Sequence, residues 1–189
     1  MSAKRRQSTV AKQPLRAGHL RPPRSRSPAI ERPFLETMLL DGIEGQVVVV
    51  RAPAGFGKTA LLSSAYELAG QRAQRPGGER LTYRGWLTLG PSHGSATRLL
   101  ADLCEALDLP ATLTDTNAIH AAIEGRGGVN VLFVDNLDAA RSPEADALFD
   151  SLVNQAPDWL RVVFATRARP RFTLVRLRLR GLLKDIGPP

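Results

Sequence analysis

The sequence predicts an α/β fold in which helices cover both faces of a parallel sheet. Runs rich in β-branched residues alternate along the chain with segments whose apolar residues recur at helical spacing. Two of these runs, residues 47–50 and 129–134, lack regular polar alternation, which is typical of strands buried on both faces. A glycine-rich loop follows the first run and leads into a helix. With 189 residues, the chain is long enough to bury a sizeable core in one domain.

Local signals predict the elements in the first half of the chain. Pro33 suits the first position of a helix, and a glycine commonly follows the last helical residue. The β-branched run at 46–50 favours a strand. The predicted elements are a helix from Pro33 to Gly42 or Gly45, strand 46–50, a helix over 59–69, a polar loop at 76–78 and strand 83–89.

Capping residues place the helices of the second half. Ser95 and Thr114 are suited to cap two helices, and Ser142 followed by Pro143 begins a third. The predicted elements are a helix from Ser95 to about 107, a helix from Thr114 to about 124, strand 129–135, a helix from Ser142 to about 155, strand 160–166 and a fifth strand over 182–186.

Six arginines lie between residues 167 and 180 with no acidic residue among them, and such a run could contact nucleic acid. The last three, however, alternate with Leu177 and Leu179, which predicts an edge strand with one exposed face. The six are Arg167, Arg169, Arg171, Arg176, Arg178 and Arg180.

The net charge of +8 belongs to the N-terminus, because residues 1–30 hold eight basic side chains and no acid, and the rest is neutral. Prolines and few large apolar residues predict a disordered basic tail over residues 1–29, followed by a folded domain over residues 30–189. Nucleic acid could bind to this tail without sequence preference. The same composition also fits an organelle transit peptide.

Cys104 is the only cysteine, so no disulfide can form within the chain. We expect His19, His93 and His120 to form no cluster that could hold zinc. No apolar run approaches the roughly 20 residues needed to span a bilayer. The basic residues of the N-terminus are not followed by the apolar stretch of a secretory signal. These features predict a cytoplasmic protein without a membrane partner.

Residues 52–59, with the sequence APAGFGKT, match the phosphate-binding loop pattern and stand between a strand and a helix. Gly55 and Gly57 allow the backbone N–H groups to point inward at an anion. Lys58 is the only lysine between positions 12 and 184 and is expected to contact the terminal phosphates, while Thr59 ligates Mg²⁺. An ordinary glycine-rich turn is the alternative.

A second motif is the apolar strand that ends in Asp135, about 75 residues after Lys58. A carboxylate at this position holds Mg²⁺ through its water shell in phosphate-loop proteins. The two motifs together predict ATP and Mg²⁺ as ligands.

These residues resemble the nucleotide-binding domain of the large ATP-binding LuxR-type transcription regulators, the group of the maltotriose-responsive activator within the STAND class of P-loop ATPases. The resemblance covers roughly residues 28–187. Its anchors are the segments 30–32, 52–59 with Leu61 and Leu62, 86–89, 134–137, 165–167 and 177–181.

The resemblance implies a P-loop NTPase fold with strand order 5-1-4-3-2. It places the segment of Arg32 beside the adenine and Arg167 at the γ-phosphate, and it implies ATP-dependent self-association. The remaining nucleotide-binding residues that it implies are Pro53, Ala54, Gly55, Phe56, Gly57, Lys58, Thr59 and Ala60.

The chain departs from this family at Asn136, where the family has a carboxylate that acts on the attacking water. An amide can orient water but cannot accept its proton. The expected function is therefore a Mg-ATP-binding switch with slow or absent hydrolysis. A stand-alone ATPase is an alternative, because the DNA-binding part of such regulators is not in this sequence, and so is an interaction module that only retains the loop.

Overall fold

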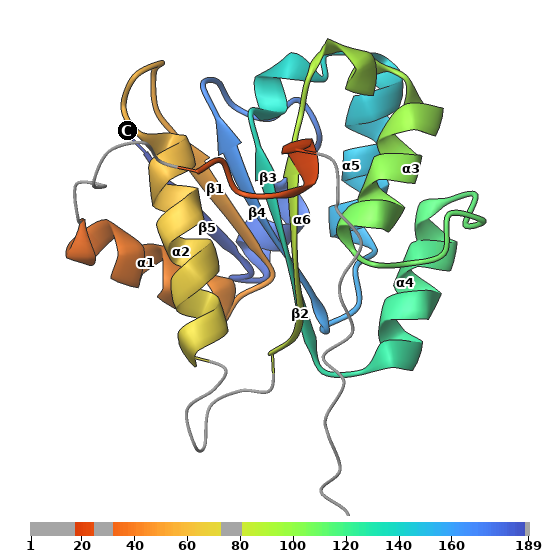
Figure 1. The fold of residues 1–189 in the computed structure, drawn as a ribbon, viewed down its shortest axis with the longest axis horizontal. Coiled ribbons are helices and arrows are strands. Elements are labelled where there is room, and N and C mark those ends of the chain that lie inside the picture. Colours follow the sequence, from red (N-terminus) through yellow and green to blue (C-terminus); the bar gives the residue numbers. More distant parts are fainter. Residues whose placement is uncertain (1–17, 25–31, 73–80, 188–189) are drawn as a thin grey trace, which may run out of the picture.

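The computed structural model describes residues 18–24, 32–72 and 81–187. Within these residues, five parallel strands form one sheet in the order β2-β3-β4-β1-β5 (Figure 1). This is the predicted order, and it places β4 between the two strands that carry the motifs. The strands are β1 (Val47–Arg51), β2 (Leu81–Thr88), β3 (Val129–Asp135), β4 (Leu160–Thr166) and β5 (Leu183–Ile186).

Helices cover both faces of the sheet, as predicted (Figure 1). Successive side chains of a strand point to opposite faces, so β1 sends Val47 and Val49 into one buried cluster and Val48 and Val50 into the other. One face carries α1 (Pro33–Ile43) and α2 (Lys58–Arg72), and the other carries α3 (Ala96–Ala106), α4 (Thr116–Arg126) and α5 (Pro143–Asn154).

The predicted caps are confirmed at α5, correct in position but without a side-chain hydrogen bond at α3, and wrong at α4. Ser142 accepts a hydrogen bond from the Ala145 N–H at 3.0 Å, with Pro143 at the first helical position. Ser95 precedes α3, but its side chain makes no capping hydrogen bond. At α4 the capping residue is Asp115, because its carboxylate accepts from the Ala118 N–H at 2.8 Å.

The predicted edge strand around Leu177 is wrong, since Val175–Leu179 forms the short helix α6. One helical turn buries Leu177 and leaves Leu179 82% exposed. The place beside β1 belongs to β5 instead. Gly181, with φ of +70°, adopts the left-handed conformation needed between α6 and β5.

The sequence predicts disorder up to residue 29, but residues 18–24 are ordered against the domain. Gly18–Leu20 forms a 3-10 helix, η1, that packs against β2 and α3. Leu20 is only 3% exposed and belongs to the same buried cluster as Leu87 and Leu99. The other residues of the predicted tail and the predicted loop at 76–78 lie outside the described residues.

The expectation about histidines is also corrected. The His19 and His93 rings lie 5.8 Å apart between centroids. His120 lies apart from them on α4, where its Nε2 bonds with the Leu152 carbonyl at 3.0 Å. Among the helices of the described ranges, we find none with the length and apolar character required to cross a membrane.

Candidate functional site

The loop between β1 and α2 has the backbone shape of an anion cradle. Gly55 and Gly57 adopt φ values of +80° and +75°, which side chains with a Cβ rarely allow. The loop ends at the N-terminus of the 15-residue helix α2. Free N–H groups and the positive end of the helix dipole at such a terminus bind phosphate.

Lys58 is folded back over this loop. Its ammonium group donates hydrogen bonds to the carbonyl oxygens of Ala52 at 2.7 Å and Pro53 at 2.9 Å. These two bonds leave one of the three N–H donors of the ammonium group available to a phosphate.

The structure brings the two predicted magnesium-binding residues, Thr59 and Asp135, into contact. The Thr59 hydroxyl donates to Asp135 Oδ2 at 2.8 Å, although the residues come from α2 and the end of β3. Neighbouring oxygens in an octahedral Mg²⁺ shell are about 2.9 Å apart, given Mg–O distances near 2.1 Å. The pair therefore fits two adjacent positions around this ion.

Asp135 is buried, with 5% of its surface exposed. Burial raises the pKa of its carboxyl group, while hydrogen bonds from Thr59 and the Asn136 backbone and the charge of Lys58 act in the opposite direction. A carboxylate whose charge is poorly solvated gains strongly from a cation. This makes Asp135 a suitable metal ligand.

A cleft of about 1080 Å³ at the carboxyl ends of the strands brings the predicted groups together. Ligands commonly bind at this edge of open parallel sheets. Of the predicted site residues, those lining the cleft are Ala54, Gly55, Gly57, Lys58, Thr59, Ala60, Asp135, Asn136 and Arg167.

Arg32 and Phe56 instead line a smaller cleft of about 330 Å³ together with Leu35 and Met38. The Arg32 guanidinium donates to the Phe56 carbonyl at 2.7 Å and thereby braces the loop. A Cβ added at Gly57 would lie 3.0 Å from this guanidinium. Apart from Pro53, which lines neither cleft, the predicted nucleotide-binding residues therefore divide between two clefts, and Lys58 lines both.

Asn136 lines the large cleft in a left-handed conformation, with φ of +59°. Its amide nitrogen donates to the Leu89 carbonyl at 3.0 Å, which links the ends of β3 and β2. The expected strand order already placed the two strands side by side, but the bond also depends on the left-handed conformation of Asn136, which no sequence signal indicated. The predicted role of Asn136 toward water stays a prediction.

Asp138 accepts a short hydrogen bond from the Arg167 backbone N–H, and its other oxygen lies 3.7 Å from Arg141. Both Asp138 and Arg167 line the large cleft. Asp138 thus fixes the backbone of the predicted γ-phosphate sensor at the tip of β4.

Sequence reasoning missed one wall of the large cleft. Pro22, Pro23 and Arg24 line it, although they fall within the segment expected to be disordered. The available signal was Leu20, a single large apolar residue two positions earlier.

Comparison with known proteins supports the fold. No protein-family model matches the chain, and no curated protein matches it. Among solved structures, the Aeropyrum pernix ORC1 protein in complex with DNA aligns with 86% of this chain and 47% of its own, at a TM-score of 0.57 and 16% identity. Caenorhabditis elegans PCH-2 aligns with 85% of this chain and 45% of its own, at a TM-score of 0.50 and 11% identity. The chain thus spans about half the length of these structures and shares with them an α/β fold built on a parallel sheet.

Proposed function

We propose that this chain binds ATP together with Mg²⁺ at the large cleft. The observation that carries the proposal is the 2.8 Å contact between Thr59 and Asp135, placed directly beside the phosphate loop. Mg²⁺ would be held by these two side chains and would neutralise charge on the phosphates. Lys58 and the N–H groups of the loop would bind the phosphates themselves.

Calorimetric titration with Mg-ATP tests this assignment. Lys58→Ala should weaken binding by about 2–5 kcal/mol, because the variant cannot place a positive charge against the phosphates. Lys184→Ala is the matched control, since it removes the exposed lysine of β5, which lines neither cleft. Equal affinities of the wild type and Lys58→Ala would reject the site, and absence of binding in both would favour an interaction module that only retains the loop.

We propose the smaller cleft as the site of the adenine. Leu35, Met38 and the exposed Phe56 offer apolar surface for a base, and Lys58 connects this cleft to the phosphate site. The proposal is supported by Arg32, which lines this cleft and whose segment the resemblance to LuxR-type regulators would place beside the adenine. In this arrangement the nucleotide extends across the loop from one cleft to the other.

We also propose that nucleotide acts here as a switch and is hydrolysed slowly. Asn136 cannot accept a proton, and the Asp138 carboxylate already accepts the Arg167 N–H. Arg167, at the end of β4, is proposed to respond to the γ-phosphate. The chain would then hold ATP for long enough to report its presence.

The larger role that we propose is the nucleotide-binding domain of a LuxR-type transcription regulator of the STAND class, located in the cytoplasm. It rests on the residue pattern around the loop and on the confirmed strand order. Self-association that depends on ATP would follow, and sedimentation with and without Mg-ATP tests it. A mass unchanged by ATP would favour the stand-alone ATPase.

A further inference from the structure

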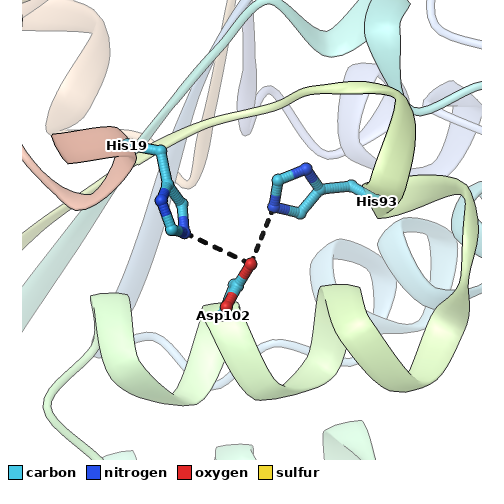
Figure 2. Close-up of side chains that lie close together, drawn as sticks. All are labelled: His19, His93 and Asp102. Carbon is cyan, nitrogen blue, oxygen red and sulfur yellow. Dashed lines mark hydrogen bonds and ion pairs between the residues drawn. The ribbon is translucent and has the colours of Figure 1, made fainter. Parts of the chain in front are cut away.

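A compact cluster of two imidazoles and a carboxylate lies on the α3 side of the sheet. His19 comes from η1, His93 from the 3-10 helix η2 (Pro91–Gly94) and Asp102 from α3. Figure 2 shows both rings directed at the carboxylate. One ligand atom from each residue lies within 4.8 Å of the other two. His93 and Asp102 are buried at 4% and 3% exposure, whereas the His19 side chain is 28% exposed, so the cluster opens to solvent on the side of η1.

We propose that His19, His93 and Asp102 bind a divalent first-row transition metal ion, for which zinc is the probe. Imidazole nitrogen and carboxylate oxygen are ordinary zinc ligands. Ligand atoms around tetrahedral zinc are about 3.3 Å apart, given zinc–ligand distances near 2.0–2.1 Å. Here Asp102 Oδ2 lies 2.9 Å from His93 Nε2 and 3.3 Å from His19 Nε2. Small shifts therefore suffice to admit the ion, with a fourth position left for water.

The surroundings of His93 suit a metal ligand. Its Nδ1 lies 2.9 Å from the Gly90 nitrogen and 3.2 Å from the Gly90 carbonyl oxygen. With zinc on Nε2, the ring proton moves to Nδ1 and can be donated to that carbonyl. Backbone carbonyls often accept this proton at metal sites and fix the orientation of the ring. Without metal, the other tautomer accepts from the Gly90 N–H, so metal binding would exchange this bond for the one to the Gly90 carbonyl.

His19 provides the second argument. Its Nε2 is buried and makes no hydrogen bond with any described residue, although it faces Asp102 Oδ2 at 3.3 Å. A buried polar atom without a hydrogen bond is uncommon in native proteins and calls for a specific explanation such as an ion. A metal between the two atoms would satisfy the nitrogen.

Arg98 is the competitor for this position. Its Nε donates to Asp102 Oδ2 at 2.8 Å, and the side chain is 55% exposed. The guanidinium can therefore move into solvent when an ion binds. A purely structural network would depend on Arg98 to balance Asp102, whereas a metal site would bind its ion more tightly without it.

The ion would fasten the N-terminal segment to the domain. His19 is remote in sequence from the other two ligands and is directly followed by Leu20 in the core. Pro22, Pro23 and Arg24 then form a wall of the large cleft. The metal would thus hold in place a part of the cleft that the phosphate loop does not reach.

The test is zinc titration by calorimetry on the full chain, without a histidine tag and after removal of metal by a chelator. One ion should bind, and His19→Ala should weaken binding by at least about 100-fold, because even the groups that only support metal ligands are worth 10–100-fold. Cys104→Ala is the control for binding by the thiol of unfolded chains and should retain the affinity. Equal affinity in the wild type and His19→Ala would overturn the proposal, as would absence of zinc binding by the wild type.

Two further readouts separate a metal site from a structural network. Arg98→Gln, which alters an exposed side chain, should raise zinc affinity several-fold, and a decrease would contradict the proposal. Zinc should also slow hydrogen exchange at Leu20 in the wild type and not in His19→Ala. Neither readout requires ATP, so its outcome is independent of the proposed nucleotide site.

Discussion

At the scale of single residues, Asp135 is unfavourable for folding and favourable for metal binding. Burial raises the pKa of its carboxyl group, so the folded chain binds the proton more tightly than the unfolded chain does. The resulting stabilisation is fully present below the unfolded-state pKa and is lost as pH rises through the folded-state pKa. At neutral pH the buried charge therefore opposes folding until a cation compensates it.

Asp135→Asn should stabilise the protein without ligand and abolish the effect of Mg²⁺ on ATP binding. The amide oxygen can still accept from Thr59, but the desolvated charge is gone. Each kcal/mol gained should raise Tm by about 2–4 °C for a chain of this size. The gain over wild type should shrink at acidic pH, where Asp135 becomes neutral.

Thermal unfolding across pH measures this difference. Asp158→Asn, at an exposed loop position, is the control and should leave Tm nearly unchanged. A lower Tm for Asp135→Asn at neutral pH would show that its hydrogen bonds outweigh its desolvation.

Asn136→Asp tests the proposal that the nucleotide acts as a switch and is hydrolysed slowly. A carboxylate cannot donate to the Leu89 carbonyl, so the new side chain should turn from β2 toward the cleft. If it then accepts a proton from water, ATP turnover should rise by about 10²–10⁴-fold.

The wild type should turn over more slowly than about 1 s⁻¹, the lower end of ordinary enzyme rates. Asn136→Ala is the matched control, because it also removes the bond to Leu89 but adds no base. A phosphate-release assay that gives the same rate for Asn136→Asp and Asn136→Ala would refute the role assigned to this position.

At the scale of secondary-structure elements, Gly85 sets the distance between β2 and α3. A Cβ at this position would press against the carbonyl oxygen of Ala106, the last residue of α3. Gly85→Ala should therefore destabilise the fold by about 1–3 kcal/mol, the usual cost of overpacking.

Gly125→Ala is the control for this prediction. Gly125 lies in α4 with open space around its Cα, so alanine should stabilise the helix by about 0.5–1 kcal/mol. Chemical denaturation of both variants measures whether the free energy of unfolding falls for Gly85→Ala and rises for Gly125→Ala. A tolerated Gly85→Ala would mean that α3 can shift away from the sheet.

The elements that the sequence predicted best are those with a strong local pattern. Residues 129–135 and 160–166 are dominated by apolar residues, several of them β-branched, and the structure confirms both strands at their predicted bounds. The proximity of Lys58, Thr59 and Asp135 followed from motif spacing. The prediction of an edge strand at residues 175–180 was wrong because two alternating leucines fit one helical turn as well as a strand. Only the pairing of β5 with β1 decides between the two structures.

At the scale of the whole molecule, the basic N-terminus is expected to bind nucleic acid independently of the domain. Deleting residues 1–17 removes five basic side chains but retains the ordered segment 18–24. Binding to duplex DNA should fall, and its log-log dependence on salt should flatten by up to about 0.9 for each phosphate that is no longer neutralised. Affinity for ATP should stay unchanged.

A variant with Arg176, Arg178 and Arg180 changed to Gln is the matched control for this deletion. All three are exposed around α6 and should contribute little to DNA binding. DNA binding that survives the deletion and disappears in this variant would transfer the interaction to the folded domain.

The position of η1 also affects which N-terminal truncations would promote aggregation. β2 is an edge strand of the sheet, and η1 packs against it (Figure 1). An uncovered edge strand offers unpaired N–H and C=O groups that pair readily with strands of other molecules. Truncation at residue 29, the boundary that composition predicts, would remove Leu20 from the core and uncover this edge. Such a protein would aggregate through β2, whereas truncation at residue 17 would keep the edge protected.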